Sequence, residues 1–437
     1  MPNPGSDLSS ERCPGGMVRP ETSMALGRAP SPATRRPDEN RVPIPRARSF
    51  VILLPIVHQI AHQTDPPAND ASPLWACVSL TWLASAGTGL GWSGIFFIAE
   101  QAYGFGRSQN LILGAVMGAV YVIGALGAGR FVRSFTRSER FSERGTLIAV
   151  CALMAIVSLV PALTESTIGL WVFAGLYIAL SGVLWPLVES FVSGGRAGAR
   201  LRKATGLFNI SWSSAMIVSM LGIAPILKDS PRSAFIGLAA AHLLCGVIAL
   251  RLLPAAGKHG EAGHGHSESE LARCRSLLRV FRIGLFTSYV LHSSLVPMLP
   301  ALLERLGVEV AFKAVLASAW MFSRFLVFLV MERSEWWHGK WFTPVFACVL
   351  MAIGFVWTHL LGAGAMPGGS RAMIASLSVL GLGIGAMYAG AIYYAMEAGG
   401  ADARDGAHIE AGGVHESMIG LGYTIGPLLA LLVLLWL

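Results

Sequence analysis

Eleven apolar runs, each long enough to cross a lipid bilayer, constrain this sequence more than any other feature. A spanning α-helix needs about 20 predominantly apolar residues. Since the bilayer interior offers no water to backbone N–H and C=O groups, helices are the expected spanning elements. The runs occupy residues 75–99, 110–129, 145–163, 168–193, 204–227, 233–253, 283–303, 310–331, 341–361, 372–397 and 412–437.

The composition excludes a soluble protein of this length. Hydrophobic residues make up 54% of the 437 residues and charged residues only 13%, whereas soluble domains contain about 25% charged residues. The sequence has no Gly-X-Y period and no sustained heptads. We therefore predict an all-α polytopic membrane protein.

The loops between the runs differ in their content of Arg and Lys, and this difference predicts the orientation. Loops on the cytoplasmic side carry an excess of basic residues. If the N-terminus is cytoplasmic, the inner loops include the basic segments 130–144, 196–203 and 251–282. The outer loops then hold only Arg107, Lys228, Arg232, Arg305, Lys313 and Arg371. We expect a cytoplasmic N-terminus and the plasma (inner) membrane, and we attribute the net charge of +8 to topology rather than to nucleic-acid binding.

Polar segments divide the chain into four regions. Residues 1–72, rich in Pro, Ser and Arg, are predicted to be a disordered cytoplasmic tail. Residues 73–253 contain six spans and form the first predicted bundle, and residues 283–437 contain five spans and form the second. The polar segment 254–282 is the predicted cytoplasmic linker between them.

The two groups of spans share a pattern that indicates an internal repeat. The fourth span ends with Glu189 and Arg196, and the tenth ends with Glu397 and Arg404, so that both carry Glu and Arg seven positions apart. The helix that follows is rich in Gly and Pro in both cases. Repeats that run in the same direction predict a two-fold axis along the membrane normal.

With this layout the chain resembles the major facilitator superfamily over about residues 74–437. The resemblance rests on the two groups of spans, the paired Glu and Arg motifs, the basic loop after the second span, and the Gly/Pro-rich fifth and eleventh spans. It implies two pseudo-symmetric helical bundles, and a monomer that performs secondary active transport of a small organic solute by alternating access. Protons are a candidate coupling ion. Two departures are evident: there is no recognisable twelfth span, and the loop after the second span lacks the family's acidic residue.

The resemblance also implies a cytoplasmic gate. In the family, the carboxylate at the position of Glu189 pairs with basic loop residues, for which the candidates here are Arg130, Arg133 and Arg196. Glu397 with Arg404 has the same interpretation in the second half. The alternatives are a static ion pair that braces the helix end, and a proton or substrate site.

Ionisable groups inside a bilayer cost several kcal/mol and are therefore candidates for function. Glu416 is the strongest candidate for proton or substrate binding, with a structural acid paired to Arg324 or His415 as the alternative. Arg324 has three interpretations: a partner for Glu416 or Glu189, a ligand for an anionic substrate, or a side chain that snorkels to the inner headgroups. We expect Glu189, Arg324 and Glu416 to share one layer. Candidates for a polar-tipped, aromatic substrate pocket include Asn209, Trp212, Tyr393 and Tyr394.

No motif indicates an enzyme or a resident cofactor. The sequence lacks G-x-x-x-x-G-K-[ST], H-E-x-x-H and G-x-S-x-G. His259, His264 and His266 in the linker are interpreted as solvated rather than metal-binding, and no metal is expected. The expected partners are the lipid bilayer, a small solute and H⁺, with no nucleic acid. The alternative function is that of a transport-inactive membrane receptor or scaffold.

Overall fold

The computed structural model describes residues 72–137, 142–196, 198–255, 268–400 and 407–436, and the predictions for the first 71 residues lie outside this part of the chain. Eleven segments of the described residues are long and apolar enough to cross a membrane, as the sequence predicts. None of the described residues forms a strand. The chain is therefore an all-α polytopic membrane protein.

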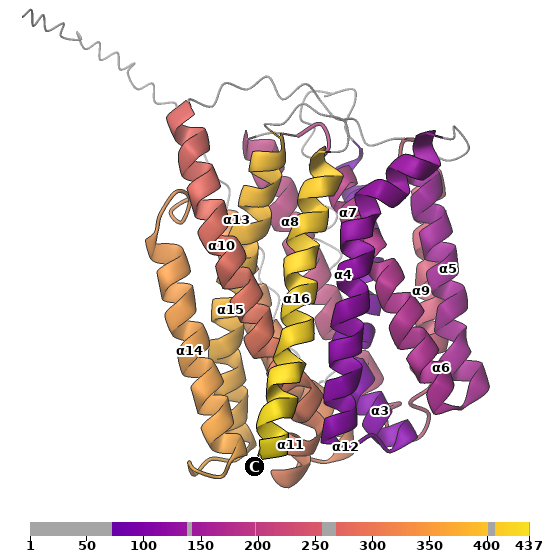
Figure 1. The fold of residues 1–437 in the computed structure, drawn as a ribbon, viewed down its shortest axis with the longest axis vertical. Coiled ribbons are helices and arrows are strands. Elements are labelled where there is room, and N and C mark those ends of the chain that lie inside the picture. The colour runs from indigo at the N-terminus through magenta and orange to yellow at the C-terminus, as the bar shows by residue number, and fades with distance from the viewer. Residues whose placement is uncertain (1–71, 138–141, 197, 256–267, 401–406, 437) are drawn as a thin grey trace, which may run out of the picture. The chain divides into compact units, whose positions relative to one another are not determined.

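Six spans precede the linker and five follow it (Figure 1). The first six are formed by α2 (Leu74–Gly89) with the π-helical turn η1 (Leu90–Gly94) and α3 (Ile95–Tyr103); α4 (Arg107–Arg137); α5 (Glu143–Thr164); α6 (Thr167–Val172) with the π-helical turn η2 (Phe173–Tyr177) and α7 (Ile178–Ser193); α8 (Gly198–Ile223); and α9 (Ser233–Leu252). The other five are formed by α10 (Glu268–Leu295) with the 3₁₀ turn η3 (Val296–Met298) and α11 (Leu299–Arg305); α12 (Val310–Ala317) with α13 (Ala319–Arg333); α14 (Phe342–Gly362); α15 (Ser370–Gly400); and α16 (Ala407–Trp436).

Several helices extend past the apolar runs at the end where α4 stops and α10 begins, which we call the linker end. Helix α4 continues to Arg137, α8 begins at Gly198, and α10 begins at Glu268, inside the segment predicted to be linker. Hydropathy marks only the part of a helix that lies in lipid, whereas helix propagation continues wherever backbone hydrogen bonds can form. Helix α8 instead stops early, at Ile223, where a run of turns begins.

The two halves meet mainly through three pairs of helices. Helix α4 packs against α16, α7 also packs against α16, and α8 packs against α13; α4 and α16 run side by side near the centre of Figure 1. Within the first half α2 packs on α8 and α4 on α7, while within the second half α10 packs on α16 and α13 on α15. Corresponding helices of the two halves therefore make corresponding contacts, as a two-fold relation between the halves predicts.

Glycines allow α4 and α16 to approach closely. A Cβ atom placed on Gly118 would lie 2.4 Å from the backbone nitrogen of Thr424, and one on Gly413 would lie 2.8 Å from the carbonyl oxygen of Ala125. Since Cβ atoms do not make contacts this short, larger residues at these positions would push the helices apart. The small residues therefore permit the central contact between the halves.

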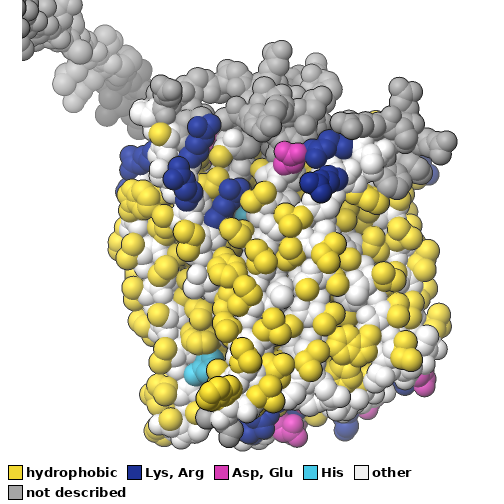
Figure 2. Space-filling view, in the orientation of Figure 1, with side chains coloured by type: hydrophobic (Ala, Val, Ile, Leu, Met, Phe, Trp, Pro, Cys, Tyr) yellow, Lys and Arg dark blue, Asp and Glu magenta, His cyan; other side chains and the backbone are white. Residues whose placement is uncertain are grey.

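The surface is apolar where lipid is expected. Figure 2 shows hydrophobic side chains over the middle of the visible face, with Lys and Arg gathered towards the linker end and a few charges at the opposite rim. Helix α14 has the smallest buried share of any span, and the exposed side chains on it include Val345, Phe346, Val349, Ile353 and Val356. Its equivalent in the first half, α5, is covered by α9.

Candidate functional site

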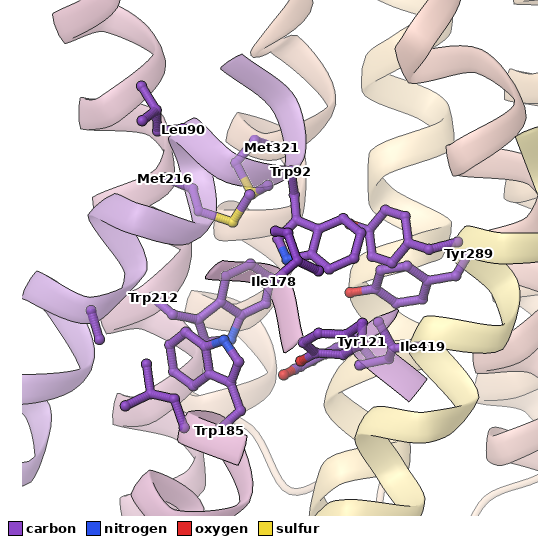
Figure 3. Packing of buried hydrophobic residues seen from close by; sticks show 14 of the residues in the cluster. Leu90, Trp92, Tyr121, Ile178, Trp185, Trp212, Met216, Tyr289, Met321 and Ile419 are labelled. Atoms are coloured by element: carbon purple, nitrogen blue, oxygen red, sulfur yellow. The ribbon is translucent and has the colours of Figure 1, made fainter. Parts of the chain in front are cut away.

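A small, partly open cavity lies between the two halves. Both halves contribute to its wall, and most of the lining side chains are aromatic. The lining residues are Thr88, Trp92, Tyr121, Trp185, Phe208, Trp212, Met216, Tyr289, Trp320, Arg324, Tyr388, Glu416, Ile419 and Tyr423. Figure 3 shows Trp92, Tyr121, Trp212 and Tyr289 approaching this region from different helices. Apolar walls with a few polar groups are typical of sites for small ligands.

The π-helical turn η1 carries Trp92 into the cavity wall. The Trp92 ring stacks on Tyr423 with ring centres 4.0 Å apart and meets Tyr121 edge to face at 5.1 Å. The side chain is 3% exposed. Single π-helical turns inside α-helices are found frequently at functional sites, because the extra residue changes the direction of a side chain.

Arg324 of α13 lies in the cavity wall surrounded by aromatic rings. Its guanidinium carbon is 4.3 Å from the ring centre of Trp212 and 4.5 Å from that of Tyr388. Its Nη2 donates a hydrogen bond of 3.0 Å to the hydroxyl of Tyr289. With 1% of its surface exposed, Arg324 does not snorkel to the headgroups, which corrects one of the three interpretations.

Arg324 also lacks the acidic partner that the second interpretation requires. Among the described residues, no Asp or Glu forms an ion pair with Arg324, and its Nε has no hydrogen-bond partner. In this arrangement Arg324 therefore forms no direct ion pair with Glu416 or Glu189, although Glu416 lines the same cavity. What remains is a buried cation, held by cation–π contacts, that faces a cavity.

Glu416 of α16 accepts a hydrogen bond from the hydroxyl of Tyr121 on α4. Its carboxylate is close to Glu189 of α7 and His415 of α16, since one ligand atom from each of the three lies within 4.8 Å of the others. Within the described part of the chain, both oxygens of Glu189 and both ring nitrogens of His415 have no hydrogen-bond partner. Gly412 makes room for Glu189, because a Cβ there would lie 2.4 Å from Oε2.

The structure thus brings together the three ionisable residues that were expected to share a layer. Arg324 and Glu416 line one cavity, and Glu189 lies beside Glu416. The two carboxylates come from different halves of the chain. Their proximity could not be inferred from the apolar runs, because it depends on how α7 and α16 face each other.

Among the described residues, no ion pair joins Glu189 to Arg130, Arg133 or Arg196 in this arrangement, so the gate that the resemblance implies for the outward-open state stays a prediction. Arg196 instead donates hydrogen bonds to the carbonyls of Phe191, Val192 and Gly194 at the end of α7, and to the carbonyl of Ser72. Burial lowers the pKa of the Arg196 guanidinium from its usual value. These carbonyls favour its charged form, so Arg196 acts as a helix cap.

Other residues join the halves at the linker end. Arg133 of α4 pairs with Glu410 of α16, and Arg202 of α8 pairs with Glu335, which follows α13. Of the remaining gate candidates, Arg130 is exposed, Glu397 is half-buried near the end of α15, and Arg404 lies outside the described residues.

At the opposite end, where α3 and α16 stop, a buried ion pair joins the halves. Lys313 of α12 lies 2.8 Å from Glu100 of α3 and 3.6 Å from Glu304, and only 6% of its side chain is exposed. Lys313 was counted among the basic residues of the outer loops. Its position inside the apolar run 310–331 was the signal that marked it as a buried charge.

The four substrate candidates do not share one cavity. Trp212 lines the central cavity, whereas Asn209 and Tyr393 line a second cavity of about 290 Å³ near Arg202. Asn209 accepts a hydrogen bond of 3.3 Å from Nε1 of Trp212 and so links the two walls. Tyr394 lines neither cavity: its hydroxyl accepts a 2.7 Å hydrogen bond from the N–H of Gly339.

A family model described as Major Facilitator Superfamily matches residues 81–427. Among curated protein sequences, none matches the chain. The match spans both groups of helices and the linker between them.

Solved structures of transporters share this fold. A variant of the E. coli fucose:proton symporter FucP aligns with a TM-score of 0.54 and 14% identity, covering 83% of this chain and 96% of FucP. The human organic anion transporter MFSD10 aligns with a TM-score of 0.56 and 16% identity, covering 82% of this chain and 92% of MFSD10. FucP in an outward conformation aligns with a TM-score of 0.51. At these identities the likeness shows the fold alone.

Proposed function

Because this chain belongs to the major facilitator superfamily, we propose that it is a secondary transporter that carries a small organic anion together with protons by alternating access. The observation that carries the proposal is Arg324, a buried guanidinium without an acidic partner among the described residues, in the wall of a cavity between the two halves.

An anionic solute would complete the environment of Arg324. A buried charge without a direct ion pair costs free energy, and an incoming carboxylate or phosphate would supply an opposite charge in contact with the guanidinium. The planar guanidinium suits two parallel hydrogen bonds to such a group. The aromatic rings around it, including Trp212 and Tyr388, would cover the apolar part of the solute. The fold that this chain shares with an organic anion transporter is consistent with this substrate class.

The carboxylates of Glu416 and Glu189 support proton coupling. Two negative charges this close, in a site with little water, repel strongly, so the pair favours a state that keeps one proton. A change in the distance between α7 and α16 would change how tightly that proton is held. The fold is shared with a proton symporter, which agrees with this mechanism.

Alternating access requires contacts between the halves that break at one end at a time. The pairs of Arg133 with Glu410 and Arg202 with Glu335 supply them at the linker end, and Lys313 with Glu100 supplies one at the opposite end. We propose that residues 73–253 and 283–437 move as the two bundles. We also propose that the linker end is cytoplasmic and the membrane is the plasma membrane, because the linker end carries most of the basic loop residues.

Flux through proteoliposomes tests this proposal. We expect the wild-type chain to accumulate members of a panel of organic anions when a pH gradient is imposed, and not to accumulate neutral or cationic analogues. Glu416→Gln should abolish accumulation driven by the gradient while exchange of solute across the membrane persists. Glu309→Gln, which removes an exposed carboxylate outside both cavities, is the matched control.

Two results would contradict the proposal. If Glu416→Gln and wild type accumulated the solute equally, proton coupling through Glu416 would be excluded. A folded chain that moves no member of the panel would support the alternative of a receptor or scaffold.

A further inference from the structure

We propose that Glu189, His415 and Glu416 form a binding site for one divalent transition-metal ion that bridges the two halves. One ligand atom from each residue lies within 4.8 Å of the other two. The side chains are 2%, 0% and 4% exposed, respectively. The proposal goes beyond transport of an organic anion and does not depend on it.

The polar atoms at this site lack partners that the protein itself could supply. Within the described residues, four atoms have no hydrogen bond: both oxygens of Glu189 and both ring nitrogens of His415. Buried polar groups are almost always paired, because a buried group that loses its water without gaining a partner destabilises the fold. A cation that accepts a lone pair from each of the three side chains would supply a partner for one nitrogen of His415 and for the carboxylate oxygens that face it.

The ligand types indicate which ions fit. One imidazole nitrogen with two carboxylate oxygens suits Zn²⁺, Mn²⁺, Fe²⁺ or Co²⁺, whereas Ca²⁺ and Mg²⁺ prefer all-oxygen sites. Metal–ligand distances of about 2.0–2.2 Å require the ligand atoms to move somewhat closer together. The ring of His415 has no hydrogen-bond partner within the described residues, so a small rotation of this ring breaks none there.

The surroundings support a metal at this position. The hydroxyl of Tyr121 donates to Glu416 and would orient that carboxylate, as groups behind metal ligands usually do. Glu416 also lines the central cavity, which leaves a coordination position open to water or to an anionic group of a solute. Two ionised carboxylates would balance the charge of the ion.

Such an ion would tie the halves together. Glu189 belongs to α7 in the first half, while His415 and Glu416 belong to α16 in the second. Because the three ligands must stay close to hold the metal, the bound ion would stabilise the arrangement seen in Figure 1 against separation of these helices. Metal binding should therefore raise the unfolding temperature and slow any flux that requires the helices to part.

Titration of the metal-stripped full chain in detergent with Zn²⁺, and separately with Mn²⁺ followed by electron paramagnetic resonance, tests the site. We expect one ion per chain and a higher unfolding temperature. Glu189→Gln, His415→Gln and Glu416→Gln should each weaken binding at least tenfold. Glu189→Asp keeps the charge but shortens the side chain, and it should also weaken metal binding. This variant replaces Glu189→Gln in the test if Glu189→Gln does not fold.

Two controls separate this site from other ligands. The triple substitution His259→Ala, His264→Ala and His266→Ala removes the linker histidines, and Glu309→Gln removes a carboxylate elsewhere on the surface. Both should bind as wild type does. The proposal fails if wild type binds neither ion in stoichiometric amount, or if binding is lost in the linker variant and kept in Glu189→Gln. Anion flux measured with a chelator present reports separately on the proposed function.

Discussion

Tyr121 of α4 donates a hydrogen bond to Glu416 of α16, so that two residues 295 positions apart in sequence join the halves inside the central cavity. Tyr121 also meets the ring of Trp92 edge to face. The carboxylate that we propose to carry a proton is therefore held by a donor from the opposite half. Movement of α4 relative to α16 would alter the protonation of Glu416 directly.

The first prediction concerns this bond. In Tyr121→Phe, Glu416 loses its donor, and an unpaired carboxylate holds its proton more tightly. We expect the pH profile of gradient-driven flux to move towards higher pH. The free energy of unfolding should fall by about 1.5–3 kcal/mol, the range for hydrogen bonds to charged groups. Flux measured across a pH series in proteoliposomes, together with thermal unfolding in detergent, reports both effects.

Tyr177→Phe is the matched control for Tyr121→Phe. Tyr177 is equally buried, and its hydroxyl bonds to His242 at 2.8 Å within the first half, as expected for a packing histidine. This variant should lose stability without a change in the pH profile. If both variants changed the profile alike, the bond between Tyr121 and Glu416 would not be the cause.

The second prediction concerns the guanidinium of Arg324. Arg324→Lys keeps the charge but loses the flat face that contacts Trp212 and Tyr388. A desolvated cation–π contact contributes about 2 kcal/mol or more, which corresponds to roughly tenfold or more in affinity. We expect at least this loss of affinity for transported anions, seen as a higher solute concentration for half-maximal flux.

Arg333→Lys tests whether any arginine on α13 has this effect. Arg333 is exposed at the end of the same helix. The Arg333→Lys variant should transport anions with the same affinity as wild type. Unchanged anion affinity in Arg324→Lys would show that the aromatic contacts do not position the cation for a solute.

The third prediction concerns the buried lysine at the opposite end. Lys313 lies 2.8 Å from Glu100 but 3.6 Å from the exposed Glu304. Because Glu100→Gln leaves the buried Lys313 with only the more distant, solvated Glu304, it should destabilise the chain by about 2–4 kcal/mol, somewhat less than the loss of a fully buried pair. Glu304→Gln should cost less than about 1 kcal/mol, since its carboxylate is solvated.

A double-mutant cycle distinguishes pairing from general damage. Lys313→Met removes the buried charge, so adding Glu100→Gln to it should cost little more. Thermal unfolding of the four chains in detergent gives the coupling free energy. Additive losses would mean that Lys313 and Glu100 do not interact.

The fourth prediction uses two glycines of one helix. A Cβ on Gly118 would lie 2.4 Å from the backbone of Thr424, whereas a Cβ on Gly127 would have no atom within 4 Å. Gly118→Ala should therefore separate α4 from α16 and destabilise the chain by about 1–3 kcal/mol. Gly127→Ala should be neutral or stabilising by up to about 1 kcal/mol. Equal unfolding temperatures for the two variants would contradict the close approach of α4 and α16.

The number of spans and their grouping follow from the sequence alone. Each run is apolar over the thickness of a bilayer by its own composition, so neighbouring helices are not needed to recognise it. Two similar motifs, Glu189 to Arg196 and Glu397 to Arg404, likewise indicated that the halves are related. The sequence did not predict that α8 begins at Gly198 or that α10 begins at Glu268. Both helix ends lie beyond the lipid, where hydropathy carries no signal.

The partners of the buried charges were decided by the tertiary structure. Glu189 was expected to pair with a nearby arginine, yet it lies beside Glu416, and Lys313 meets Glu100, 213 positions away. Such contacts depend on which faces of two helices meet, and therefore on packing along their full length. Hydropathy describes each helix against lipid, but it contains no information about the rotation of one helix against another.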